Sequence, residues 1–137
     1  MSAYVEHANI TVADLDQAIV FLQTAVPEFT VRHQGQNRYR WCHIGTEHSY
    51  IALQEVVERT EPDRTPYVDV GINHIGIVVD DSHAVEQRLL AAGYRANELS
   101  EDSAYRRRVY FFDPSGTEWE FIEYFSADPA QRNHYPE

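Results

Sequence analysis

Two histidines and one glutamate occupy matching places in the two halves of the sequence, and their side chains could bind a metal ion together. His7 and His74 each lie seven residues before an aspartate, within short runs of β-prone residues, and Glu120 lies in another such run near the end of the chain. Two neutral imidazoles and one carboxylate form a facial ligand set that suits Fe(II), Mn(II), Zn(II), Ni(II) or Co(II) and leaves positions open for substrate. The residues alone leave open the alternative that both histidines are hydrogen-bonded interior side chains and that Glu120 faces solvent.

The surroundings of Glu120 predict a β-hairpin. Asp113-Pro114-Ser115-Gly116 is a turn signal, because proline presets φ and glycine tolerates positive φ. Strands are predicted on either side, over Arg107–Phe112 and Glu118–Phe125. Alternation along the second strand puts Glu118 and Glu120 on one face and the aromatic side chains on the other. A carboxylate in the middle of a strand is costly unless it is paired, hydrogen-bonded or bound to a metal.

The first half of the chain predicts the order β-α-β-β-β. A helix begins after Asp14, where Gln17 completes a capping box, and it ends at Pro27. Its apolar positions recur with helical spacing. The four strands are predicted over Tyr4–Val12, Phe29–Gln34, Arg38–Ile44 and Tyr50–Val56.

The second half repeats this order. Gly93 stands where a helix C-terminus needs positive φ. Aligning Gly45 with Asp113 places Ala52 opposite Glu120. Such self-similarity indicates a duplicated fold. The elements are predicted as a strand over Ile72–Val79, a helix over Ala84–Ala92, a strand over Tyr94–Leu99 and the hairpin described above.

These elements predict an α+β fold with two tandem modules in one chain. Module one covers residues 4–56 and module two covers residues 72–125, each with its helix against the convex side of its sheet. The segment 57–71 is charged, carries two prolines and lacks periodicity, so we interpret it as a surface linker. Residues 126–137 are predicted to form a loose tail.

Composition excludes several classes of partner. The chain has 137 residues and a net charge of −11, which argues against binding to nucleic acid or an anionic membrane. It contains no apolar run of bilayer length, and its start lacks the pattern of a secretory signal. The single cysteine, Cys42, excludes an internal disulfide and fits a reducing compartment. We therefore expect a cytoplasmic protein that acts on a small molecule.

The segments "VEHANITVADLDQAIVFL", "INHIGIVVDD" and "FFDPSGTEWEF" resemble the vicinal oxygen chelate superfamily, and the resemblance extends over about residues 4 to 125. That group includes glyoxalase I, bleomycin-resistance proteins, fosfomycin-resistance thiol transferases and extradiol dioxygenases. The resemblance implies that the modules form a curved, half-open mixed sheet around a metal cavity. It also implies His7, His74 and Glu120 as the metal ligands.

The sequence differs from particular branches of this superfamily, and these differences bear on which reaction is expected. Glyoxalase I resemblance would require a fourth, acidic ligand at Ala52, and alanine cannot ligate a metal. The remaining three-ligand set resembles the extradiol dioxygenases, which usually carry four modules, and the fosfomycin enzymes. Those fosfomycin enzymes carry a threonine where this chain has Asn9 and use a lysine, a residue that is absent here.

Further residues are predicted to line the cavity. Alternation directs Asn9, His48, Tyr50 and Glu118 inward; we assign Asn9 and His48 to substrate binding and Tyr50 and Glu118 to catalysis. Tyr110 is a candidate proton donor, and His43 is its alternative because only one of the two registers was expected to face inward. Arg108 could bind an anionic substrate, although the arginines on these strands could instead form a salt-bridged surface that balances the acidic residues.

The predicted function is that of a divalent-metal-dependent enzyme that acts on a small oxygen-bearing substrate by Lewis-acid chemistry, as an isomerase or lyase. The alternatives are an Fe(II) extradiol-type dioxygenase and a metal-free binding protein of the bleomycin-resistance type. We also predict a homodimer, because a half-open cup exposes sheet edges and apolar surface.

Overall fold

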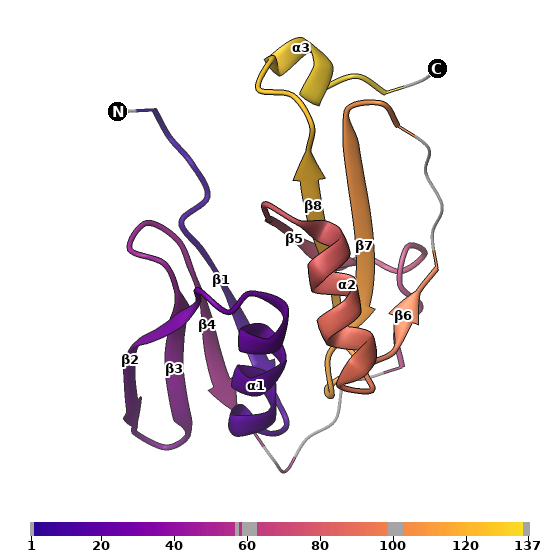
Figure 1. The fold of residues 1–137 in the computed structure, drawn as a ribbon. Helices are drawn as coiled ribbons and strands as arrows, with labels where there is room; N and C mark the ends of the chain where they lie inside the picture. The colour runs from indigo at the N-terminus through magenta and orange to yellow at the C-terminus, as the bar shows by residue number, and fades with distance from the viewer. Residues whose placement is uncertain (1, 57, 59–62, 99–102, 136–137) are drawn as a thin grey trace. The chain divides into compact units, whose positions relative to one another are not determined.

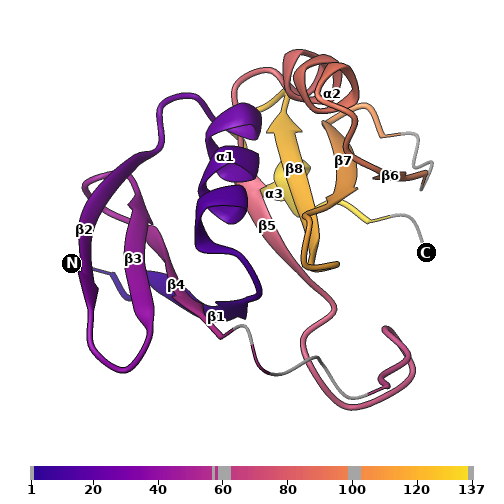
Figure 2. The same ribbon diagram turned by 90° about the horizontal axis from the view of Figure 1, so that it is seen from below.

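The computed structural model describes residues 2–56, 58, 63–98 and 103–135. Parts of the predicted linker (57 and 59–62), the last residue of the predicted strand Tyr94–Leu99, and residues 136–137 of the tail lie outside the described residues. The chain divides into two compact units, Met1–Arg64 and Thr65–Glu137, which are drawn in Figures 1 and 2 and described one by one below.

The first unit is a four-stranded mixed sheet with one helix against it. In chain order its elements are β1 (His7–Val12), α1 (Leu15–Ala25), β2 (Thr30–Gln36), β3 (Arg40–Gly45) and β4 (Tyr50–Glu55). The sheet order is β1-β4-β3-β2, and β1 runs parallel to β4 while the other pairs are antiparallel. The strand β1 therefore lies at an edge of the sheet, beside the last strand of its own unit.

The second unit repeats this plan. Its elements are β5 (His74–Val78), α2 (Ser82–Ala91), β6 (Ala96–Asn97), β7 (Arg106–Phe112) and β8 (Glu118–Tyr124), followed by a short helix α3 (Pro129–Arg132). The order β5-β8-β7-β6 matches that of the first sheet, with β5 parallel to β8. The predicted α+β fold with tandem β-α-β-β-β modules is thus confirmed, and neither sheet closes on itself.

Both long helices begin in the same way. The carboxylates of Asp14 and Asp81 accept the backbone N–H groups three residues further on, at Gln17 and Ala84. A glutamate from the last strand of each sheet then accepts the first helical N–H: Glu55 from Leu15 at 2.8 Å, and Glu123 from Ser82 at 2.8 Å. Each helix is thereby attached to its sheet by a charge-assisted hydrogen bond.

Each core lies between a helix and one face of its sheet. In the first unit Phe21 and Leu22 of α1 are buried together with Cys42 and Ile44 of β3. In the second unit Trp119 and Phe121 of β8 are buried on the side of α2, as alternation predicted. The side chains on the opposite face of each sheet do not belong to these cores.

The turn before β8 is built around Asp113. Its carboxylate accepts the backbone N–H groups of Ser115 and Thr117 and the indole N–H of buried Trp119, at 2.9–3.0 Å. Gly116 has a φ of +86°, in the left-handed region that favours glycine. The turn therefore has its own hydrogen-bonded framework, although burial raises the pKa of the Asp113 carboxyl above its ordinary value.

This turn corrects the predicted alignment of the two halves. Gly45 pairs with Tyr50, whereas Phe112 pairs with Glu118, so Gly45 corresponds to Phe112 and the second turn is one residue longer. His43 pairs with Ala52, and Tyr110 pairs with Glu120. The expectation that only one of His43 and Tyr110 faces inward was therefore wrong, because they are equivalent residues, while Ala52 does correspond to Glu120.

The remaining differences lie at the ends of elements. The strand β1 begins at His7, three residues later than predicted, and β6 is only two residues long. The predicted loose tail includes helix α3, and Arg106 donates a hydrogen bond to the carbonyl of His134 at 2.8 Å. Within the described part of the chain, no helix is long and apolar enough to cross a membrane.

Candidate functional site

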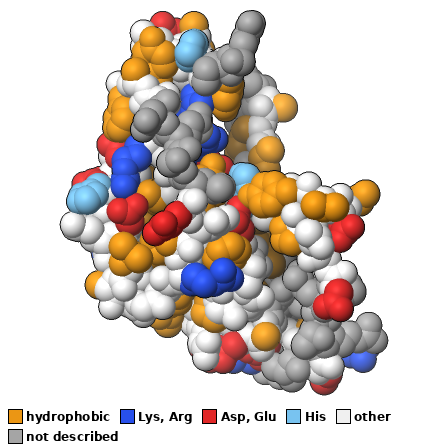
Figure 3. All heavy atoms as spheres, turned by 90° about the vertical axis from the view of Figure 1, so that its right-hand side faces the viewer, with side chains coloured by type: hydrophobic (Ala, Val, Ile, Leu, Met, Phe, Trp, Pro, Cys, Tyr) orange, Lys and Arg blue, Asp and Glu red, His pale blue; other side chains and the backbone are white. Residues whose placement is uncertain are grey.

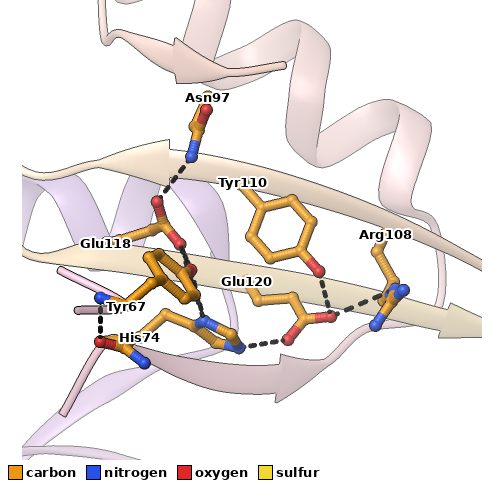
Figure 4. Close-up of polar contacts among 8 residues, drawn as sticks. Tyr67, His74, Asn97, Arg108, Tyr110, Glu118 and Glu120 are labelled. Atoms are coloured by element: carbon orange, nitrogen blue, oxygen red, sulfur yellow. Dashed lines mark hydrogen bonds and ion pairs between the residues drawn. The ribbon is translucent and has the colours of Figure 1, made fainter. Parts of the chain in front are cut away.

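The face of the second sheet away from α2 gathers ionisable and phenolic side chains from four strands and the segment before β5 (Figure 4). The strand pairing explains the gathering, because His74 lies opposite Glu118, and Tyr110 lies opposite Glu120. Directly opposite residues on adjacent strands project on the same side of a sheet. The cluster consists of Tyr67, His74, Asn97, Arg108, Tyr110, Glu118 and Glu120.

Glu120 lies at the centre of one half of the cluster and is 5% exposed. Its Oε2 is 2.9 Å from Nε2 of His74. Its Oε1 accepts the hydroxyl hydrogen of Tyr110 at 2.9 Å and lies 3.4 Å from Nε of Arg108. The carboxylate is therefore paired and hydrogen-bonded, as a buried charge requires.

Glu118 forms the other half, on the far side of the imidazole. Its Oε1 accepts the hydroxyl hydrogen of Tyr67, and its Oε2 accepts the amide of Asn97 at 2.8 Å. The Tyr67 oxygen is also 2.9 Å from Nδ1 of His74, and Oε1 of Glu118 is 3.6 Å from the same nitrogen. The His74 ring thus lies between two buried carboxylates (Figure 4).

The hydrogens of this chain of contacts can be assigned. Tyr67 has one hydroxyl hydrogen, and that hydrogen goes to Glu118, so the Tyr67 oxygen accepts a hydrogen from Nδ1 of His74. A neutral imidazole with its proton on Nδ1 has a lone pair on Nε2. That lone pair would face an oxygen of Glu120 at 2.9 Å, which is repulsive unless a cation stands between them. The cation is either a proton that the two residues share or a metal ion.

A divalent metal fits the two donors. Imidazole nitrogen and carboxylate oxygen are both donors that divalent metals accept, and here they face each other at 2.9 Å. Metal-bound histidines usually donate their other N–H to an oxygen, as His74 does to Tyr67. Among the residues that the structure describes, no group of three or more histidine, cysteine, aspartate or glutamate side chains is close enough to hold a metal, so this unit supplies a pair of donors and not a full set.

Tyr67 and Asn97 were missed by the sequence analysis. Tyr67 belongs to the predicted linker, where no periodicity indicates which side chains face a site. Its backbone φ is +67°, unusual for tyrosine, and its N–H donates to the side-chain oxygen of Asn73 at 2.7 Å. Asn97 lies on the two-residue strand β6, opposite Tyr110, and only the strand pairing reveals its direction.

Both phenols keep their protons at neutral pH. Burial, and then the hydrogen bond to Glu118, raise the pKa of Tyr67 to about 12. Burial and the hydrogen bond to Glu120 also raise the pKa of Tyr110. The two hydroxyls therefore act as hydrogen-bond donors that hold the carboxylates in place, and neither is prepared to act as a base.

The other predicted site residues belong to the first unit. The rings of His7 and Tyr50 stack with centroids 4.8 Å apart, and Nδ1 of His7 is 3.0 Å from Oε1 of Glu6. Asn9 is exposed on β1. His48 lies in the turn before β4 and is exposed there, so strand alternation does not extend to it.

Some arginines of β3 and β7 hold a helix to its sheet, and another lies in the cluster around Glu120. Arg40 donates two hydrogen bonds to Asp16 at 2.8 and 3.2 Å, and the equivalent Arg107 pairs with Glu86 at 2.9 Å. Both hold a helix to its sheet. Arg108 lies on the other face, beside Glu120.

Comparison with known proteins agrees with this fold. Residues 4–121 match the Glyoxalase/Bleomycin resistance protein/Dioxygenase superfamily. None of the curated proteins matches the sequence significantly.

Solved structures share the architecture at low identity. A glyoxalase family protein from Bacillus cereus has a TM-score of 0.75 at 18% identity, covering 92% of this chain and 97% of its own. A glyoxylase/bleomycin resistance protein/dioxygenase domain from Frankia sp. EAN1pec has a TM-score of 0.73 at 19% identity, covering 90% and 99%. Fosfomycin resistance protein FosX from Listeria monocytogenes, complexed with Mn(II) and sulfate, has a TM-score of 0.70 at 18% identity, covering 98% and 100%. With a family match over most of its length and the same fold, the chain belongs to the glyoxalase/bleomycin resistance/dioxygenase superfamily.

Proposed function

We propose that this protein is a divalent-metal-dependent enzyme that acts on a small oxygen-bearing substrate, with His7, His74 and Glu120 as the metal ligands. The observation that carries the proposal is the contact between Nε2 of His74 and Oε2 of Glu120 at 2.9 Å, with Nδ1 of the same ring held by Tyr67. Such a pair needs a cation, and a metal meets that need while keeping the imidazole neutral. His7 is the third ligand of this proposal, since it occupies the equivalent position to His74 in the first unit.

The protein side chains have distinct roles in this proposal. The bound metal would act as a Lewis acid that polarises a substrate oxygen. Tyr110 holds Glu120 in position, and Arg108 adds positive charge beside it, which favours an anionic group on the substrate. Glu118 is the candidate for moving a proton, because it lies beside the metal pair without belonging to it. Tyr50, stacked on His7, contributes a wall to the site in the first unit.

Ala52 occupies the position where a glyoxalase I would have its fourth metal ligand. We therefore favour a redox-neutral reaction that differs from that of glyoxalase I. Its methyl group is buried and cannot bind a metal. With one carboxylate as ligand, the site retains positive charge and suits bidentate binding of a vicinally oxygenated or anionic substrate. FosX from Listeria monocytogenes, a structural neighbour, is complexed with Mn(II), and Mn(II) is therefore the first metal to test.

The test is to load the metal-free protein separately with Mn(II), Fe(II), Ni(II) and Zn(II) and to measure binding by calorimetry. We expect one site per chain, and Glu120→Gln and His74→Ala should each weaken binding at least about tenfold. Glu98→Gln, an exposed substitution in the same unit, is the control. Equal affinity in all three variants would refute the ligand assignment.

Activity assays then separate the reaction classes. Oxygen uptake with catechols in the Fe(II) protein alone would identify a dioxygenase. Turnover of the methylglyoxal–glutathione adduct would show that the argument from Ala52 is mistaken. We further expect a cytoplasmic enzyme, since a lone buried cysteine fits a reducing compartment.

The second candidate function is that of a metal-free binding protein. It is supported by the same contact between His74 and Glu120, because a proton can take the place of the metal there. If the cation between His74 and Glu120 is a proton, the pair is an imidazolium–carboxylate ion pair that needs no metal. Nitrogen NMR of the metal-free protein would then show both His74 nitrogens protonated, and the spectrum would not change when Mn(II), Zn(II) or Ni(II) is added.

A further inference from the structure

Five aromatic rings cross the first sheet on the face away from α1, and His7 alone among them is a proposed metal ligand. We call them the ring row: His33 on β2, Trp41 and His43 on β3, Tyr50 on β4 and His7 on β1. Successive ring centroids lie 5.4, 5.3, 4.6 and 4.8 Å apart. The row is therefore continuous over all four strands of the sheet.

The widest ring of the row packs over a neighbour that has no side chain. Gly35 is paired with Trp41 across the strands. A Cβ on Gly35 would lie 2.7 Å from Cζ2 and 2.9 Å from Cε2 of the indole, closer than real Cβ contacts allow. The indole thus occupies the space above the neighbouring backbone. A large ring in this place gives a planar molecule an aromatic surface to stack on.

The row also carries positive charge in an acidic protein. A register shift between Val31 and His33 takes Arg32 out of the ladder, and its guanidinium lies 4.5 Å from the centroid of the Tyr50 ring. Burial first, and then the charges of His33, Arg32 and His7, lower the pKa of His43. Its ring is therefore neutral at pH 7. Among the described acidic side chains, Glu6 meets the end of the row at His7.

We propose that the ring row binds a planar aromatic molecule that carries an anionic group, with its ring system on Trp41 and its anion toward Arg32. The inference names the substrate class of the proposed enzyme and rests on that proposal in taking the bound molecule as the substrate. The second unit has Arg108, Tyr110 and Glu118 at the positions of Trp41, His43 and Tyr50. The repeated scaffold thus presents rings in one unit and mainly charged or hydrogen-bonding groups in the other.

The experiment measures binding of three probes to the metal-free protein by isothermal titration calorimetry. The first is 2-naphthoate, which is planar and anionic. The second is decahydro-2-naphthoate, with the same carbon skeleton and charge but no flat ring, and the third is 2-naphthylmethanol, which is flat but neutral. We expect 2-naphthoate to bind at least about five times more tightly than either analogue, because an aromatic contact and a charge contact are both required. Equal binding of the saturated acid would overturn the proposal.

Two variants test the surface itself. Trp41→Leu removes the indole and should weaken 2-naphthoate binding about five- to tenfold. Gly35→Ala retains every ring and should have a similar effect, because the new methyl group displaces the indole from its position. Phe125→Leu, which removes an exposed aromatic ring in the second unit, is the control. Circular dichroism establishes that each variant is folded, and unchanged affinity in folded Gly35→Ala and Trp41→Leu would refute the proposal.

The charge contact is tested by Arg32→Gln. This variant should reduce binding of 2-naphthoate to the level of 2-naphthylmethanol, and an unchanged preference for the anion would contradict the role of Arg32. The probes are bound without metal, so this result is separable from the proposed function. If His74→Ala loses metal binding but still binds 2-naphthoate, the ring row is established independently of the metal site. If the protein binds metal as expected but does not bind 2-naphthoate, the metal site stands and the ring-row proposal fails.

Discussion

The hydroxyl of Tyr67 lies between His74 and Glu118, and its single hydrogen sets which nitrogen of His74 carries a proton. A phenol is well suited to this task, because its raised pKa keeps the hydrogen in place across the neutral range. The imidazole is then oriented with Nε2 toward Glu120. Tyr67 is therefore a positioning residue, which acts on the chemistry through His74.

Tyr67→Phe tests this role. The variant keeps the ring and removes only the oxygen that accepts the Nδ1 hydrogen, so Mn(II) affinity measured by calorimetry should fall about tenfold. In nitrogen NMR of the metal-free protein, the Nδ1 resonance of His74 should move, because its hydrogen-bond acceptor has been removed. Tyr135→Phe removes an exposed hydroxyl from the same unit and should change neither measurement. A normal affinity and an unchanged Nδ1 resonance in Tyr67→Phe would contradict the assignment.

Cys42 illustrates a buried acid with no part in the site. Burial raises the pKa of its thiol to about 11 from an ordinary 9.0. The unfolded chain therefore releases this proton first as pH rises, so the contribution of the neutral thiol to stability is complete below about pH 9 and is lost toward pH 11.

We accordingly expect iodoacetamide to modify Cys42 at pH 8 at least about tenfold more slowly in the native protein than in urea. Mass spectrometry over time measures both rates. The free energy of unfolding should also fall between pH 9 and pH 11, and less steeply in Cys42→Ala. Fast modification of the native protein would show that the thiol is accessible.

Sequence reasoning succeeded along single strands, and it failed for residues outside strands and where the alignment of the two halves crossed a turn. The period of two placed Glu118 and Glu120 together because β8 is continuous, and it failed at His48 because that residue lies in a turn. Tyr67 could not be found, since a single unusual φ and a hydrogen bond from its own N–H to the side chain of Asn73 direct it to the site. Such features depend on tertiary contacts, which one sequence does not reveal.

At the level of elements, the attachment of helix to sheet is the feature that both units share most closely. Glu55 and Glu123 each accept the first N–H of a helix, and Arg40 and Arg107 add an ion pair beside it. Strand alternation alone puts both glutamates on the helix side of their sheets. Their partners became apparent once the strands were paired with their helices.

Glu123→Ala should therefore destabilise the fold more than its surface location suggests. The substitution leaves the N–H and hydroxyl of Ser82 without their acceptor, and Ser82 is buried. We expect the free energy of unfolding to fall by about 2 kcal/mol, measured by urea denaturation. Glu98→Ala, at an exposed position, should change it by less than about 0.5 kcal/mol. Equal effects of the two substitutions would contradict this account.

At the level of the whole molecule, both units expose features that favour association. The strands β1 and β5 lie at the edges of their sheets. Val70, Ile72 and Val78 are exposed around β5, and Figure 3 shows hydrophobic side chains between acidic and basic ones on the surface. An edge strand beside exposed apolar side chains is a common site of subunit contact.

We predict a homodimer, with a mass by light scattering of about twice the 15.9 kDa of one chain. Ile72→Asp should shift the distribution toward the monomer, because a charge in an apolar contact is costly. Leu90→Asp, at an exposed position on α2, should leave the mass unchanged. A wild-type mass near that of one chain at micromolar concentration would refute the prediction.

The extra residue in the turn around Asp113 bears on how the two halves could diverge after duplication. An insertion within β7 or β8 would have reversed the direction of every following side chain in that strand. Glu118 and Glu120 would then have faced α2, and Trp119 and Phe121 would have faced solvent. Because the insertion lies in the turn, the halves differ in length while the alternation of side chains along each strand is kept. Each sheet could therefore acquire different functional side chains while the fold stayed the same.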